Sequence, residues 1–215
     1  MKYLLENIND FLKNPRDWLT TIKFYITSIF VSQKEKNNVL IQAKNQSEAI
    51  LTKNGLNIPF KVDLDDTEDI YFRTVAMYDM GSSETGMVKI FIKSHLIGKD
   101  IDRVVFCILH EYSHAIYEEG FTRNFELGLE ILKLREYVNP NLQQKREGIV
   151  FDLNEHEYEK EHFCDWFAFY LMDKIKTRDC ESEEKIKKIC ENIIRKYVQK
   201  QTCKPFFTMS KGNPP

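Results

Sequence analysis

Hydrophobic positions along the chain recur with two different periods, which separate expected helices from expected strands. Spacings of three and four are typical of amphipathic helices. They predict helices over residues 4–12, 15–31, 35–52, 124–138 and 182–201. Alternation of hydrophobic and polar positions is typical of half-buried strands. It predicts strands over residues 59–64, 70–78 and 87–92. We expect the last two strands to form a hairpin across the Gly- and Ser-containing residues 79–86.

One further segment, residues 104–117, is apolar nearly all round, which predicts a buried helix. It contains the sequence HEYSH, in which His110 and His114 lie four positions apart. On a helix these two imidazoles project from one face and can bind one cation. Glu111 lies about 100° further around, where it can reach a water molecule at that cation. A chance pattern is the alternative, but buried polar groups need partners, and a metal ion would supply one.

A catalytic zinc ion needs a third protein ligand and leaves its fourth position to water. The acidic segment over residues 154–165 begins 40 residues after His114. We expect Glu161 to be the third ligand. Asp165, one helical turn later, is expected to accept a hydrogen bond from a histidine ring. A solvated acidic helix start is the alternative for this pair. The other candidate ligands in the segment are His156, Glu157, Glu159 and His162.

HEYSH followed by EHFCDWFA at residues 161–168 resembles the ImmA/IrrE group of zincin metallopeptidases, whose pattern is HExxH followed by an ExxxD/N-x-F-A helix. The resemblance covers residues 70–175, and Cys164 stands where the family often has Ala. It implies an α+β class, with a mainly helical zincin-like metallopeptidase fold and a small, largely antiparallel sheet beside the HExxH helix. It also implies Zn²⁺ held by His110, His114 and Glu161, with Glu111 as catalytic base and Asp165 behind a histidine.

The expected function is therefore zinc-dependent endopeptidase cleavage of a protein substrate. The resemblance points to a DNA-binding transcriptional regulator as substrate and to a mobile-element or phage origin. A zincin-fold binding or antirestriction protein, acting on a repressor or on single-stranded DNA without proteolysis, is the alternative. A fourth protein ligand would make the zinc structural and favour that alternative. One hypothesis is that residues 87–92 hold an extended substrate by main-chain hydrogen bonds. A plain core strand is the alternative for most of their side chains. The candidate oxyanion stabilisers are Tyr78, His95, Tyr112 and His156.

Residues 14–49 are similar to the start of the ArdC-type antirestriction N-terminal domain, a module that binds single-stranded DNA. The similarity ends at residues 57–69, which are short and acidic where that module has a Trp- and Gly-rich strand segment. The aromatic residues of this region fall at core spacing, whereas single-strand binders use aromatic stacking platforms. We therefore expect residues 1–58 to be a helical region packing on the core, with nucleic-acid binding as the alternative. Residues 59–203 would form the zincin-like metallopeptidase domain, and residues 204–215 an irregular tail.

Composition adds limits rather than a function. The chain has 31 Lys and Arg against 33 Asp and Glu, so its net charge of −2 gives no electrostatic signal for a polyanion. Five cysteines without C-x-x-C spacing indicate reduced intracellular thiols, and Cys107 and Cys164 are expected to pack as small hydrophobic residues. The first residues lack a secretory signal, and the apolar run over residues 22–31 is too short to cross a bilayer. We therefore expect a cytoplasmic protein with no membrane partner.

Overall fold

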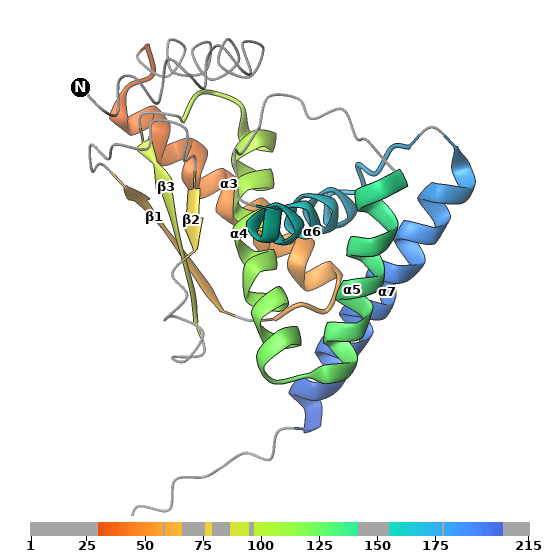
Figure 1. Cartoon of the computed structure of the whole chain (residues 1–215). Helices are drawn as coiled ribbons and strands as arrows, with labels where there is room; N and C mark the ends of the chain where they lie inside the picture. Colours follow the sequence, from red (N-terminus) through yellow and green to blue (C-terminus); the bar gives the residue numbers. More distant parts are fainter. Residues whose placement is uncertain are drawn as a thin grey trace, which may run out of the picture.

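The computed structural model describes residues 30–57, 59–65, 76–78, 87–94, 97–141, 155–177 and 179–203. Within these ranges the chain forms five helices and one three-stranded sheet (Figure 1). The helices are α3 (Gln33–Lys53), α4 (Ile101–Thr122), α5 (Phe125–Asn141), α6 (Glu155–Leu171) and α7 (Cys180–Cys203); the strands are β1 (Phe60–Asp65), β2 (Ala76–Tyr78) and β3 (Val88–Lys93). The expected α+β class, dominated by helices, is confirmed. The helix expected over residues 4–12 lies outside the described residues, as do residues 15–29 of the next one, and residues 30 and 31 are described but not helical.

Helix α4 is the central element of the fold. All its side chains from Val104 to Ile116 are buried, which explains why this stretch is apolar nearly all round. The sheet and α3 pack against it, α5 packs against its other side, and α6 crosses it (Figure 1). Since every face of α4 is covered, polar side chains within it can be satisfied only by neighbouring elements or by a bound ion.

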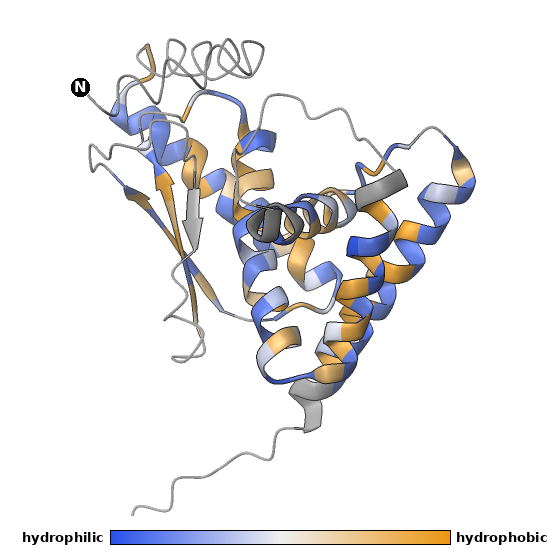
Figure 2. Ribbon diagram, in the orientation of Figure 1, coloured by the Kyte–Doolittle hydropathy of each residue, from blue (hydrophilic) through white to orange (hydrophobic). Residues whose placement is uncertain are grey.

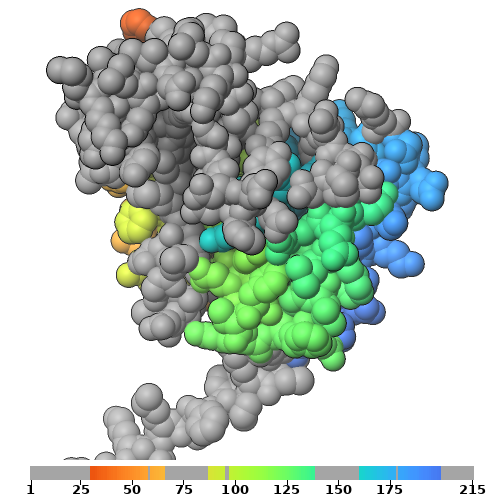
Figure 3. Space-filling model, viewed as in Figure 1, coloured from red at the N-terminus to blue at the C-terminus, as the bar shows by residue number. Residues whose placement is uncertain are grey.

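Helices α5 and α7 pair along an apolar seam. On α7 the buried residues recur at three- and four-residue spacing: Ile186, Cys190, Ile193 and Tyr197. This confirms the amphipathic stripe that the sequence predicts for this helix. In Figure 2 the apolar residues of the two helices lie largely where they face each other, and hydrophilic residues cover the outside of α7. Helix α5 contributes to the green surface of Figure 3, and its residues Phe125 and Leu129 are exposed.

The ends of α3 are set by local chemistry. Ser32 and Glu35 form a capping box, in which the Glu35 N–H donates to Ser32 Oγ and the Ser32 N–H donates to Glu35 Oε2. At the other end Gly55 has a positive φ of 72°, which glycine adopts without strain. The helix predicted to end at residue 52 ends at Lys53, with Asn54 as its C-cap. Helix α3 packs against α4. The boundaries of the three regions predicted from the sequence, 1–58, 59–203 and 204–215, stay predictions.

The sheet is mixed, with strand order β1-β3-β2. Strands β2 and β3 pair antiparallel over three residues, as expected for the arms of the predicted hairpin. Strands β1 and β3 pair parallel over six residues, from Phe60 opposite Val88 to Asp65 opposite Lys93. The expectation of a largely antiparallel sheet is therefore wrong. Alternating hydrophobicity identifies the buried face of a strand but carries no information about the direction of its neighbour.

The position of β3 also corrects its proposed role. An extended substrate can add only to a strand with a free edge. Because β3 lies between β1 and β2, both of its edges already carry main-chain hydrogen bonds within the described sheet. Residues 90–92 are therefore paired on both sides and do not form the expected substrate-holding edge, while residues 88 and 89 pair with β1 alone within the described residues.

Gly120 does not end a helix, although a glycine at this place in the sequence suggests a break. Helix α4 continues through it to Thr122. Gly120 and Gly128 instead allow close contact between α4 and α5. A Cβ built on Gly120 would lie 3.3 Å from the Gly128 nitrogen, and one built on Gly128 would lie 2.8 Å from the Gly120 carbonyl oxygen. The two helices thus cross at a pair of glycines. Among the described helices none has the length and apolar character needed to cross a membrane.

Candidate metal centre

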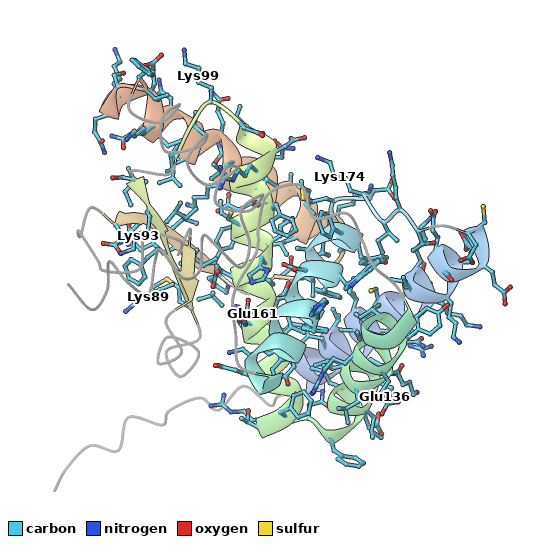
Figure 4. All side chains as sticks on the ribbon, turned by 45° about the horizontal axis from the view of Figure 1, so that its top comes forward. Lys89, Lys93, Lys99, Glu136, Glu161 and Lys174 are labelled. Atoms are coloured by element: carbon cyan, nitrogen blue, oxygen red, sulfur yellow. The ribbon has the colours of Figure 1, made fainter. Side chains whose placement is uncertain are left out.

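The site forms where α6 crosses α4, and two short sequence patterns supply it. Helix α4 contributes His110, Glu111 and His114, all of them buried. Helix α6 contributes side chains at positions 161, 164 and 165, which share one face because their spacing is i, i+3 and i+4. Figure 4 labels Glu161 of α6 where that helix lies beside α4.

The Glu161 carboxylate lies between the two imidazoles of α4. Its Oε2 is 2.8 Å from Nε2 of His110, and its Oε1 is 3.3 Å from Nε2 of His114. The two rings are 5.0 Å apart, centroid to centroid, at an interplanar angle of 80°. The residue expected to be the third ligand is therefore in contact with the Nε2 atoms of both histidines.

The other nitrogen of each ring also faces α6. Nδ1 of His110 lies 2.9 Å from Oδ1 of Asp165, the contact that the sequence predicts behind a histidine. Nδ1 of His114 lies 3.2 Å from Sγ of Cys164. This second contact corrects the expectation that Cys164 only packs as a small hydrophobic residue. Its position three residues after Glu161, on the same helix face, was the signal in the sequence that could have revealed it.

The charges of the cluster favour a cation between the rings. Burial opposes charge on His110, but its hydrogen bonds with Asp165 and Glu161 outweigh burial and raise its pKa well above the ordinary value. Burial likewise opposes charge on Glu161, yet its contacts with both histidines lower its pKa strongly. The carboxylates thus stabilise positive charge at this point, whether it is carried by a proton or by a metal ion.

Glu111 occupies the position expected for a base. Its Oε2 lies 3.8 Å from Nε2 of His114, on the side of that ring that also faces Glu161. Burial raises the pKa of the Glu111 carboxyl, with the two histidines opposing that effect. A carboxylate with a raised pKa is a stronger proton acceptor than a solvated one.

His110, His114 and Cys164 offer ligand atoms that all lie within 4.8 Å of one another, and this buried group could hold a metal ion. Nitrogen, sulfur and carboxylate oxygen are the donors that zinc takes in proteins. Two donors at tetrahedral angles on one zinc ion lie about 3.4 Å apart for nitrogen with oxygen and about 3.6 Å apart for nitrogen with sulfur. The distance from Nε2 of His114 to Glu161 is close to the first value, and that from Nε2 of His110 to Glu161, at 2.8 Å, is shorter than it. The distance from Nδ1 of His114 to Cys164 is shorter than the second value.

Of the remaining candidate ligands and oxyanion stabilisers, only Tyr112 and His162 have described side chains. Tyr112 is buried and packs edge-on against Phe60 of β1, with ring centroids 5.9 Å apart, so it faces the sheet. Its place two residues from each histidine puts it on the opposite side of α4, which removes it as an oxyanion stabiliser. His162 follows Glu161 and lies about 100° around α6 from it. The side chains that lie outside the described ones are those of Tyr78, His95, His156, Glu157 and Glu159.

Comparisons of the chain with protein-family models, with curated proteins and with solved structures give no match.

Proposed function

We propose that this protein is a zinc-dependent metallo-endopeptidase of the ImmA/IrrE-like zincin type, with His110, His114 and Glu161 as the metal ligands. The observation that carries the proposal is the contact of both histidine Nε2 atoms with the two oxygens of one carboxylate. An HExxH helix supplies two ligands and a base, and a second helix supplies the third ligand, the arrangement expected for metal-assisted hydrolysis.

The donor set fits zinc in composition and in charge. Two neutral imidazoles and one carboxylate leave a single positive charge on a bound dication, and the neighbouring Asp165 and Glu111 carboxyls can balance it. Asp165 also holds Nδ1 of His110, which directs Nε2 of that ring toward Glu161. This support from a second carboxylate is typical of histidine ligands.

In the proposed reaction the protein positions groups and moves one proton. When bound, zinc lowers the pKa of a water molecule toward about 7 and polarises the scissile carbonyl. Glu111 accepts the proton of the attacking water on its carboxylate and transfers it to the leaving amine. Burial of Glu111 suits both steps, because it brings the basicity of the carboxylate nearer to that of the groups with which it exchanges the proton.

The substrate we propose is a protein, and the family resemblance favours a DNA-binding transcriptional regulator. A binding protein with a closed, structural metal site is the second candidate. The observation that favours it is the buried group of His110, His114 and Cys164, whose ligand atoms lie within 4.8 Å of one another, because it adds a sulfur to the possible donors. Four protein ligands would leave no position for water.

The test is cleavage of a peptide library by the zinc-loaded full chain. Proteome-derived peptides with blocked amines are incubated with protein, and each cleavage releases a new free amine that mass spectrometry identifies. We expect new amino termini when the peptides are incubated with the native protein. Glu111→Gln should reduce cleavage by about 10²- to 10⁴-fold, the usual contribution of a general base, with zinc content unchanged.

Glu119→Gln is the matched control, since it makes the same change on the same helix, at a residue whose described ion pair is with Arg123. It should cleave like the native protein. Absence of cleavage by the zinc-loaded native chain, or equal cleavage by Glu111→Gln, would contradict the peptidase. Loss of zinc in Glu111→Gln would contradict the role given to Glu111.

A further inference from the structure

We propose that Cys164 is a positioning residue for His114, accepting a hydrogen bond from the Nδ1–H of that ring and leaving the fourth metal position open. The inference rests on the proposed function, because it takes His110, His114 and Glu161 as ligands. It adds a residue for which the family pattern gives no role, since the family often has Ala at this position.

The two nitrogens of the His114 ring face different partners. A histidine that binds a metal through one nitrogen carries a proton on the other, and that proton needs an acceptor when it is buried. Nε2 of His114 is directed at Glu161 and Glu111. Its Nδ1 is directed away from them, at the sulfur of Cys164. The two contacts therefore lie on opposite sides of one ring.

His110 has the same arrangement of partners as His114. There, Nε2 faces Glu161 and Nδ1 faces Asp165, a strong acceptor on the next position of α6. Cys164 and Asp165 are consecutive, and each lies behind one histidine while Glu161 lies in front of both. The face of α6 thus presents one carboxylate to the two Nε2 atoms and one acceptor to each Nδ1 atom.

Burial makes an acceptor supplied by the protein important for His114. Only 5% of His114 is exposed, and Cys164 beside it is fully buried, so solvent has little access to the contact between Nδ1–H and the sulfur. A neutral sulfur accepts more weakly than a carboxylate. The two histidines are therefore held by acceptors of unequal strength, with the weaker one behind His114.

Cobalt and zinc titrations of the full chain test the proposal. Cobalt(II) bound to a thiolate gives an intense charge-transfer absorption in the near ultraviolet, whereas cobalt bound to nitrogen and oxygen does not. We expect the native protein to bind Co²⁺ without that absorption. Cys164→Ala should weaken Zn²⁺ affinity about 10- to 100-fold, the usual effect of removing the partner of a ligand histidine. Cys164→Ser should recover part of that loss, because a hydroxyl can also accept from Nδ1–H.

Cys190→Ala is the control for packing, as Cys190 is equally buried but lies on α7. It should lose stability to a similar extent as Cys164→Ala and keep native metal affinity. A charge-transfer absorption that Cys164→Ser abolishes would make Cys164 a ligand and overturn the proposal. Native affinity in Cys164→Ala would also overturn it.

Glu161→Gln distinguishes a wrong ligand set from a wrong role for Cys164. If this variant loses zinc while Cys164→Ala binds normally, the ligand set stands and only the role of Cys164 is wrong. If the native chain binds neither Zn²⁺ nor Co²⁺, the ligand set and the role of Cys164 are both wrong.

Discussion

Lys93 at the end of β3 and Asp65 at the end of β1 form a buried ion pair, with 2.6 Å between Nζ and Oδ2. The two residues are direct neighbours in the parallel register, and only 1% of the Lys93 side chain is exposed. Removing one member of such a pair leaves the other charge buried without its partner. We predict that Lys93→Met lowers the free energy of unfolding by about 3–5 kcal/mol, measured by urea denaturation.

Lys61 provides the control for this prediction, since its pair with Asp63 lies on the surface of β1. Lys61→Met should change the free energy of unfolding by less than about 1 kcal/mol, as for exposed ion pairs in general. Equal effects of the two substitutions would mean that burial of the Lys93 pair does not determine its contribution.

Zinc binding should release a proton at neutral pH. The raised pKa of His110 keeps its ring protonated there in the metal-free protein, and a metal ion must displace that proton from Nε2. We predict release of roughly one proton per zinc ion at pH 7. Calorimetric titrations in buffers of different ionisation enthalpy measure it. Asp165→Asn should reduce the release, because the Asp165 carboxylate is a principal cause of the raised pKa.

The same shift fixes the direction of two pH effects. Protonated His110 stabilises the metal-free fold fully below its ordinary pKa, and this contribution is lost as pH rises through the raised pKa. Zinc affinity has the opposite trend and increases over that range, since fewer protons compete. A zinc affinity that falls as pH rises from 6 toward 8 would contradict the assignment of His110 as a ligand.

The glycine crossing of α4 and α5 gives a stability prediction. In Gly128→Ala the new Cβ would lie 2.8 Å from the Gly120 carbonyl oxygen, a backbone atom that can move only if the helices separate. We predict a loss of about 1–3 kcal/mol in the free energy of unfolding, typical of overpacking. In Gly120→Ala the nearest atom is the tip of the Ile131 side chain, which can change rotamer. The loss should therefore be smaller.

Chemical denaturation of both variants distinguishes this effect from helix propensity. Alanine is the better helix former by about 1 kcal/mol. If propensity were the main factor, Gly128→Ala would be more stable than the native chain. That result would mean that the two helices do not need their close contact.

Local periodicity was enough to predict the parts of the site that lie on one helix. The four-residue spacing of His110 and His114 places them together on any helix, and the same holds for Glu161 and Asp165. The contact between the two pairs could not be deduced from period alone, because it depends on how α6 docks on α4. Glu161 was expected from its place in the acidic segment and from the family resemblance, and its oxygens lie 2.8 Å and 3.3 Å from the Nε2 atoms of the two rings.

Two features could not be predicted because the same residue type can have different structural roles. Cys164 lies among apolar residues, so its sequence context suggests packing, and only its helix face indicates a polar role. Gly120 suggests a helix end until its neighbour Gly128 is known. The start of α3 could have been found more accurately, since Ser32 and Glu35 have the spacing of a capping box.

Helices α4 and α6 meet at residues that are far apart in the chain, since His110 and Glu161 are separated by 51 positions. An ion shared by these two side chains would close that long loop much as a covalent cross-link does, and the unfolded chain could not hold it equally well. Resistance of the protein to heat and to proteolysis would then depend on the concentration of free zinc around it. When zinc is scarce, the protein would thus be degraded as well as lose its proposed metal-dependent activity.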